Sequence, residues 1–124
     1  MQKHSDKDPE YESALVKIIT ENWRLMQLFL KVVSKLDNNE AAKYCNQARY
    51  IKKIIDGSLQ EIDLKIVDLS GEVYDAGMAA TAINLEDFDS SEILIVEQMI
   101  EPLIMSKNGV KKQGLISLVK AVNR

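Results

Sequence analysis

A heptad-like apolar seam in the first third of the chain constrains the fold more than any other feature. Its positions are separated by steps of three and four residues and are Leu15, Ile18, Asn22, Leu25, Phe29, Val32 and Leu36. This spacing predicts one long amphipathic helix over residues 15–36. Because such a helix needs a partner to cover its apolar side, we expect these seven residues to form the interface of a homodimer.

The width of the seam favours a bundle over a two-stranded coiled coil. Ile19, Met26 and Val33 each follow a seam position and broaden the apolar stripe. The signal Asp8-Pro9-Glu10 predicts the helix start. Asn22, the single polar seam position, either fixes the pairing register inside an interface or faces solvent where packing is loose, and the sequence leaves both readings open.

A second amphipathic helix is predicted after a turn at Asp37-Asn38-Asn39, with Asn38 or Asn39 as its cap. Its apolar positions keep the spacing of three and four and run from Ala41 to Ile62, so the helix should end near Asp63. Two such helices joined by a short turn form a hairpin that cannot cover both stripes by itself. We therefore expect two hairpins to pair as a four-helix bundle.

The rest of the chain has the pattern of short strands. Apolar or β-branched runs at 79–85, 92–98, 102–105 and 114–122 alternate with turn-forming stretches, and Asn108-Gly109 is typical of a tight hairpin. The segment 68–77 has the composition of a loop. The prediction is an α+β fold with a flexible tail over 1–9, a dimerising helical hairpin over 10–67 and a small, mainly antiparallel β domain over 68–124.

Charge and hydropathy exclude several classes of partner. A net charge of −3 gives no basic surface for DNA, RNA or an anionic membrane. The longest apolar runs are far shorter than the roughly 18 residues that span a bilayer. One cysteine, Cys45, cannot form an internal disulfide, and the first ten residues are polar. We expect a cytoplasmic protein.

The sequence offers little for catalysis or for metal binding. His4, the single histidine, lies in the predicted tail, and Cys45 adjoins the apolar stripe of the second helix, where an inert thiol is expected. Zinc would need four His or Cys ligands. The acidic run 86–92 lacks the glycine and the final glutamate of a calcium loop. The expectation is a protein that is not an enzyme and that holds no metal and no cofactor.

The second half of the chain resembles the C-terminal part of the GrpE family, the nucleotide exchange factors of Hsp70 chaperones. The resemblance lies in DLSGEVYDAGMAATAI, in ILIVEQ and in NGVKKQGLISLVKA, which follow the family's order of loop, strand, turn and basic last segment. The family's His-Glu-Ala-Val and Arg-x-Leu-Arg-Pro-Ala motifs are replaced here. The chain is thus similar to a divergent GrpE-like member without the family's long N-terminal helix.

This resemblance implies a co-chaperone whose β domain promotes ADP release from an Hsp70 or Hsp70-like ATPase. Carried over position by position, it implies partner contacts at Gln98, Glu101, Lys111 and Lys112. The alternative is a homodimeric adaptor that binds another protein without any effect on nucleotide.

Overall fold

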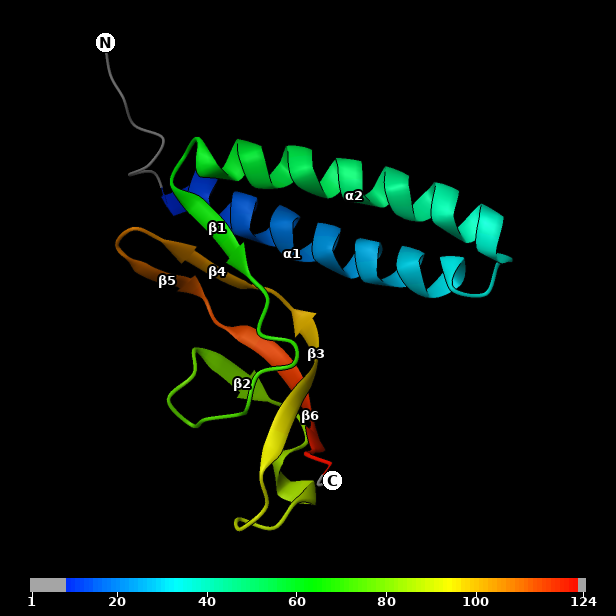
Figure 1. The fold of residues 1–124 in the computed structure, drawn as a ribbon. Helices are drawn as coiled ribbons and strands as arrows, with labels where there is room; N and C mark the ends of the chain where they lie inside the picture. The colour runs from blue at the N-terminus through cyan, green and yellow to red at the C-terminus, as the bar shows by residue number, and fades with distance from the viewer. Residues whose placement is uncertain (1–8, 123–124) are drawn as a thin grey trace. The chain divides into compact units, whose positions relative to one another are not determined.

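The computed structural model describes residues 9–122, and its fold is α+β, as predicted (Figure 1). Two helices are followed by two small, mostly antiparallel sheets. The chain divides into two compact units between Asp63 and Leu64. Most of the predicted tail, including His4, lies outside the described residues, and Pro9 belongs to the first helix.

Helix α1 runs from Pro9 to Val33, with the proline in its first turn, where the missing N–H leaves no carbonyl unpaired. Glu10 and Glu12 stand in the same turn, where a carboxylate is favoured by the helix dipole. The prediction placed the end of this helix at Leu36 and was wrong by three residues. Two tight-turn hydrogen bonds, from Lys35 N–H to Val32 O and from Leu36 N–H to Val33 O, end it earlier.

Helix α2 runs from Asn38 to Gln60 and is capped by Asp37, not by Asn38 or Asn39 as predicted. The Asp37 carboxylate accepts a hydrogen bond from Glu40 N–H at 3.0 Å. Past the helix, Asp63 adopts a positive φ of 62° and redirects the chain. Strand β1, Leu64–Val67, begins there, so the four residues 64–67 that were predicted to belong to the hairpin form part of the β unit.

The first sheet has the order β1–β4–β5 and is antiparallel throughout. Strands β4, Leu103–Ser106, and β5, Gly109–Lys112, form the hairpin predicted at Asn108-Gly109. Gly109 has a φ of 128°, a conformation that a side chain would strain. The Ser106 hydroxyl supports this turn by accepting a hydrogen bond from Asn108 N–H at 3.0 Å.

The second sheet has the order β2–β6–β3. Strand β2, Ala80–Ala82, runs parallel to β6, Gly114–Lys120, whereas β3, Leu94–Glu101, runs antiparallel to it and carries two irregularities. A 3-10 turn, η2, Leu85–Asp87, follows β2. One face of this sheet contributes Val96, Met99, Ile116 and Leu118 to the core of the β unit. Ile104 of β4, in the other sheet, is equally buried.

Besides the long connection from β1 to β2, the two sheets are joined at two short crossovers. The chain leaves β3 and enters β4 through buried Pro102, and it leaves β5 and enters β6 through Gln113. Gly114 lies at the second crossover, where an added Cβ would stand 3.0 Å from Met99 Cε and 3.5 Å from Leu103 Cβ. The glycine therefore allows the two crossovers to pack closely.

The segment 68–77, predicted as a loop, is held against the edge of β3. Gly71 N–H donates to Val96 O at 2.8 Å, Val96 N–H donates to Glu72 O at 2.9 Å, and Tyr74 N–H donates to Leu94 O at 2.8 Å. Val73 forms an antiparallel bridge with Ile95. The segment thus protects one half of an edge strand that would otherwise be open.

Candidate functional site

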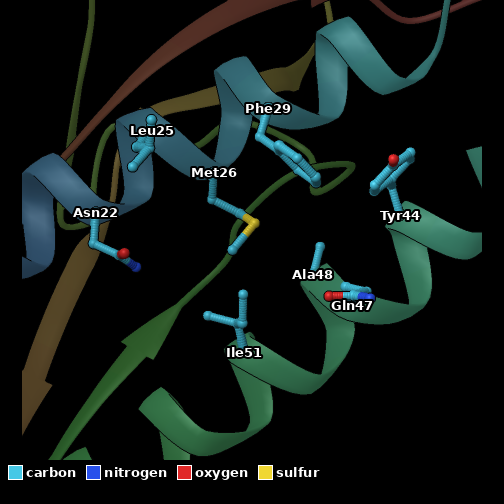
Figure 2. Close-up of a pocket in the computed structure, with 8 residues that line it drawn as sticks. All are labelled: Asn22, Leu25, Met26, Phe29, Tyr44, Gln47, Ala48 and Ile51. Atoms are coloured by element: carbon cyan, nitrogen blue, oxygen red, sulfur yellow. The ribbon is translucent and has the colours of Figure 1, made fainter. Parts of the chain in front are cut away.

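An apolar groove opens between the two helices of the hairpin (Figure 2). Its volume is about 410 Å³. At one end the rings of Phe29 and Tyr44 meet edge to face, with centroids 6.3 Å apart and planes at 85°. The groove is lined by Asn22, Leu25, Met26, Phe29, Tyr44, Gln47, Ala48 and Ile51. A mostly aliphatic and aromatic lining of this size shows that the hairpin does not fill the space between its own helices.

The predicted dimer seam is largely exposed in the single chain. Ile18, Leu25 and Val32 are 66%, 64% and 56% exposed, and Phe29 and Leu36 are exposed by somewhat more than a third. Leu15 and Asn22 are half-buried. By contrast, Ile19 and Val33, from the row that widens the stripe, are buried. Five of the seven seam positions are therefore exposed in the described chain, as are Tyr11, Leu28 and Leu30 of α1 outside the seam.

Asn22 lies on the wall of the groove and not on a fraying end of the helix (Figure 2). It is surrounded there by the apolar side chains of Leu25, Met26 and Ile51. A segment laid in the groove would bury its amide, which then requires a hydrogen-bond partner. The role of Asn22 in fixing a pairing register stays a prediction.

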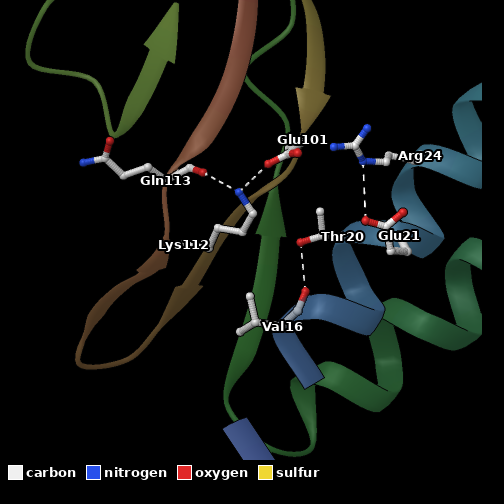
Figure 3. Close-up of polar contacts among 7 residues, drawn as sticks. All are labelled: Val16, Thr20, Glu21, Arg24, Glu101, Lys112 and Gln113. Carbon is white, nitrogen blue, oxygen red and sulfur yellow. Dashed lines mark hydrogen bonds and ion pairs between the residues drawn. The ribbon is translucent and has the colours of Figure 1, made fainter. Parts of the chain in front are cut away.

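Other polar groups of α1 are satisfied locally (Figure 3). The buried Thr20 hydroxyl donates to Val16 O at 2.8 Å, and Arg24 Nε lies 3.6 Å from Glu21 Oε2. A back-bonded threonine and an exposed ion pair one turn apart are ordinary features of a helix.

In the β unit, two of the predicted partner-binding residues bind each other. Lys112 Nζ lies 2.8 Å from Glu101 Oε1 and donates a second hydrogen bond to Gln113 O at 3.2 Å (Figure 3). The two side chains are only 22% and 19% exposed, so solvent screens the pair less than it screens a surface pair. Glu101 ends β3 and Lys112 ends β5, so their ion pair links the starts of the two crossovers and has a structural role.

Gln98 and Lys111 lie on different sheets. Gln98 is exposed on β3, opposite Ser117 and beside an irregularity of the strand. Lys111 is exposed on β5, at the edge of the other sheet. The structure therefore brings Glu101 and Lys112 together, whereas Gln98 and Lys111 belong to different sheets.

The residues that sequence reasoning missed are on the outer face of the β2–β6–β3 sheet. Cross-strand partners share a face, and Ile95 pairs with Val119 on one side and bridges to Val73 on the other. Val73 is 60% and Val119 is 41% exposed. The sequence signal for this face was the unbroken apolar run ILIV at 93–96, where β3 begins. A strand with one solvated face should instead alternate apolar and polar residues.

Cys45 and Glu92 are two further chemistry-bearing groups of the described chain. Cys45 is half-buried on α2. In the acidic run, Glu92 Oε1 accepts a hydrogen bond from Asp89 N–H at 2.9 Å and Glu92 Oε2 lies 3.0 Å from Lys120 Nζ, which together lower the pKa of Glu92, the backbone hydrogen bond being the larger cause. Within residues 9–122, no cluster of three or more His, Cys, Asp or Glu side chains is arranged to hold a metal ion.

Neither helix of the described chain has an apolar stretch long enough to cross a bilayer. Comparison with models of protein families, with curated proteins and with solved structures finds no significant match to this chain.

Proposed function

We propose that the protein is a GrpE-like co-chaperone that acts in the cytoplasm and promotes ADP release from an Hsp70 or Hsp70-like ATPase through its β unit. The observation that carries the proposal is the order of the parts. A helical hairpin with an unfilled groove precedes a compact β unit, and the β unit contains the sequence runs that resemble the family.

The mechanism requires no chemistry from the chain. An exchange factor binds the open form of the nucleotide-binding lobes more tightly than the closed, ADP-holding form. By linkage it weakens ADP binding by the ratio of those two affinities.

The hairpin is proposed to form a homodimer. The exposed seam residues Ile18, Leu25 and Val32 and the apolar groove beside them would be covered by a second hairpin in a four-helix bundle. Burial of large aliphatic side chains contributes about 1.5–3 kcal/mol each when they leave water completely. Several such residues per copy are enough to drive association.

The second candidate is a homodimeric adaptor that binds a protein partner and leaves its nucleotide untouched. The mutual ion pair of Glu101 and Lys112 favours this candidate, because it occupies two of the four residues that the family resemblance assigns to the ATPase.

Release of a fluorescent ADP analogue from purified Hsp70-type ATPases, followed by stopped flow, tests the proposal. Addition of the full chain should accelerate release by at least about tenfold with one of them, which corresponds to lowering the barrier to ADP release by about 1.4 kcal/mol. Binding to an ATPase without acceleration would select the adaptor. Absence of both binding and acceleration with every such ATPase would refute the co-chaperone function.

A further inference from the structure

The β2–β6–β3 sheet has aliphatic side chains on both of its faces. Its inner face is buried through Leu94, Val96 and Met99 of β3 and Ile116 and Leu118 of β6. Alternation along the strands places the intervening residues on the opposite, outer face. The outer face therefore has no core to cover it within the β unit.

The outer face is defined by three rows across the sheet. The first row is Val73–Ile95–Val119, in which each residue is paired with the next. The second contains Gln98 and Ser117, and Ile83 extends it because Ile83 N–H donates to Ile116 O at 2.9 Å, one residue beyond the β2 ladder. Leu115 occupies the third, between Thr81 and Glu101. Val73, Ile83 and Val119 are 60%, 58% and 41% exposed.

The charge around this face is almost entirely negative. The 41 residues from Ile66 to Ser106 contain nine acidic residues and no lysine, arginine or histidine. Glu72 precedes Val73, Glu97 lies in the irregular part of β3, and the acidic turn that follows Ile83 contains Glu86 and Asp87. On β6 the single basic residue is Lys120. With its adjoining loops the sheet has a formal charge of −8 over residues 68–101 and 114–122.

The strands of the other sheet have the opposite charge. Residues 64–67 and 103–113 contain four lysines, Lys65, Lys107, Lys111 and Lys112, and no acidic residue. The β unit thus separates its charges by sheet. Like charges that face each other across an interface are destabilising, so the acidic surroundings of the outer face act against the docking of a second copy on it.

From this combination we infer that the outer face of the β2–β6–β3 sheet is the docking surface for a partner protein whose contact surface is aliphatic at its centre and basic at its rim. The inference rests on the proposed function and deepens it, because it names the surface of the β unit that meets the ATPase and the charge that the ATPase must present. Aliphatic contacts in the centre hold the complex, and the acidic rim speeds the encounter.

A matched pair of variants tests the surface in the full chain. Val73→Thr with Val119→Thr keeps the β-branched shape at two exposed positions while replacing a methyl group with a hydroxyl. Val110→Thr makes the same change on β5 at a position of similar exposure, 45%, outside the outer face. Binding to the Hsp70-type ATPase that responds in the ADP assay is measured by surface plasmon resonance at low and at high salt.

The double variant should bind about tenfold more weakly than the parent chain and Val110→Thr should bind like the parent, with all affinities falling as salt rises. If the double variant binds the ATPase as tightly as the parent chain and accelerates ADP release from it equally, the surface is wrongly assigned although the exchange function stands. Affinity that is constant or rises with salt contradicts the basic rim. A changed mass of the double variant in light scattering would make the face an interface between copies and overturn the inference.

If no Hsp70-type ATPase binds the chain, the proposed function is refuted but the docking surface is not. A pair of peptides then tests the docking surface directly. Both synthetic peptides have valine at every second position. The residues between the valines are lysine in the first peptide and glutamate in the second. The lysine peptide should shift the amide resonances of Val73, Ile95 and Val119 in the labelled full chain, and the glutamate peptide should not. Equal shifts with both peptides, or none with either, would refute the docking surface.

Discussion

Asn84 shows how a single side chain can extend a sheet. Its amide nitrogen donates to Leu118 O at 3.0 Å and its amide oxygen accepts from Leu118 N–H at 2.9 Å, so the side chain makes the two hydrogen bonds that a strand residue would make. In the sequence Asn84 has the character of a turn residue. Its role was not predictable, because the partner stands 34 positions away and only the tertiary fold brings the two together.

Glu92 makes the β unit sensitive to acid. The Asp89 backbone N–H and Lys120 hold the pKa of Glu92 below its ordinary value, so the ionised form stabilises the folded state. This stabilisation is fully present above the pKa of Glu92 in the unfolded chain and is lost as the pH falls through the lowered folded pKa. Glu92→Gln should therefore reduce the free energy of unfolding at neutral pH and make its decline at acid pH shallower.

Urea unfolding followed at several pH values measures this effect. Glu86→Gln, a change in the same acidic run, is the control and should keep the pH dependence of the parent chain. A parallel loss of stability for Glu92→Gln at neutral and at acid pH would contradict the assignment.

At the scale of elements, periodicity predicted the two helices, but local capping set their ends. Asp37 starts α2 one residue before the predicted caps, and the turn after Val33 removes Leu36 from α1. In the β unit, the apolar runs marked four strands, β2, β3, β4 and β6. The polar strand β5 and the parallel pairing of β2 with β6 were not predictable from local patterns, because both depend on which distant strand lies alongside.

The ion pair of Glu101 and Lys112 affects how a charge reversal at Lys112 should change the stability of the fold. The sequence predicts that Lys111→Glu and Lys112→Glu together leave the fold intact. Lys112 contacts Glu101, so Lys112→Glu should place two carboxylates side by side in a partly buried position. We expect that variant alone to lower the free energy of unfolding by about 2 kcal/mol, and Lys65→Glu, at an exposed position of β1, to change it by less than about 0.5 kcal/mol.

Chemical denaturation of both single variants measures the difference. Equal stability of the two variants would show that the pair of Glu101 and Lys112 does not hold the crossovers together.

The seam on α1 gives a direct test of the proposed dimer. Leu25→Asp with Phe29→Asp puts two charges into the apolar groove, and the desolvation of a carboxylate that lacks a counter-ion opposes any bundle formed there. The mass measured by light scattering should fall from that of two chains to that of one. Tyr50→Asp, at an equally exposed position of α2 outside the groove, should leave the mass unchanged; an unchanged mass for the seam variant would refute the interface.

At the scale of the whole molecule, the two candidate functions differ in one measurable quantity, the coupling between the chain and ADP on the ATPase. An exchange factor weakens ADP binding and is itself weakened by ADP to the same extent, typically by a factor of about 5 to 150. An adaptor has a coupling factor of one. Calorimetric titration of the ATPase with the chain, with and without saturating ADP, should show the first behaviour, and equal affinities in both titrations would leave only the adaptor.

The order in which the chain builds its two sheets also limits how the β unit can be inherited. One sheet contains β1, β4 and β5 and the other contains β2, β3 and β6, so the chain passes between the sheets three times. A gene rearrangement that copied only the first or the last half of residues 64–120 would deliver neither sheet complete. Recombination can therefore move this unit only as a whole, whereas its exposed faces can diverge one residue at a time.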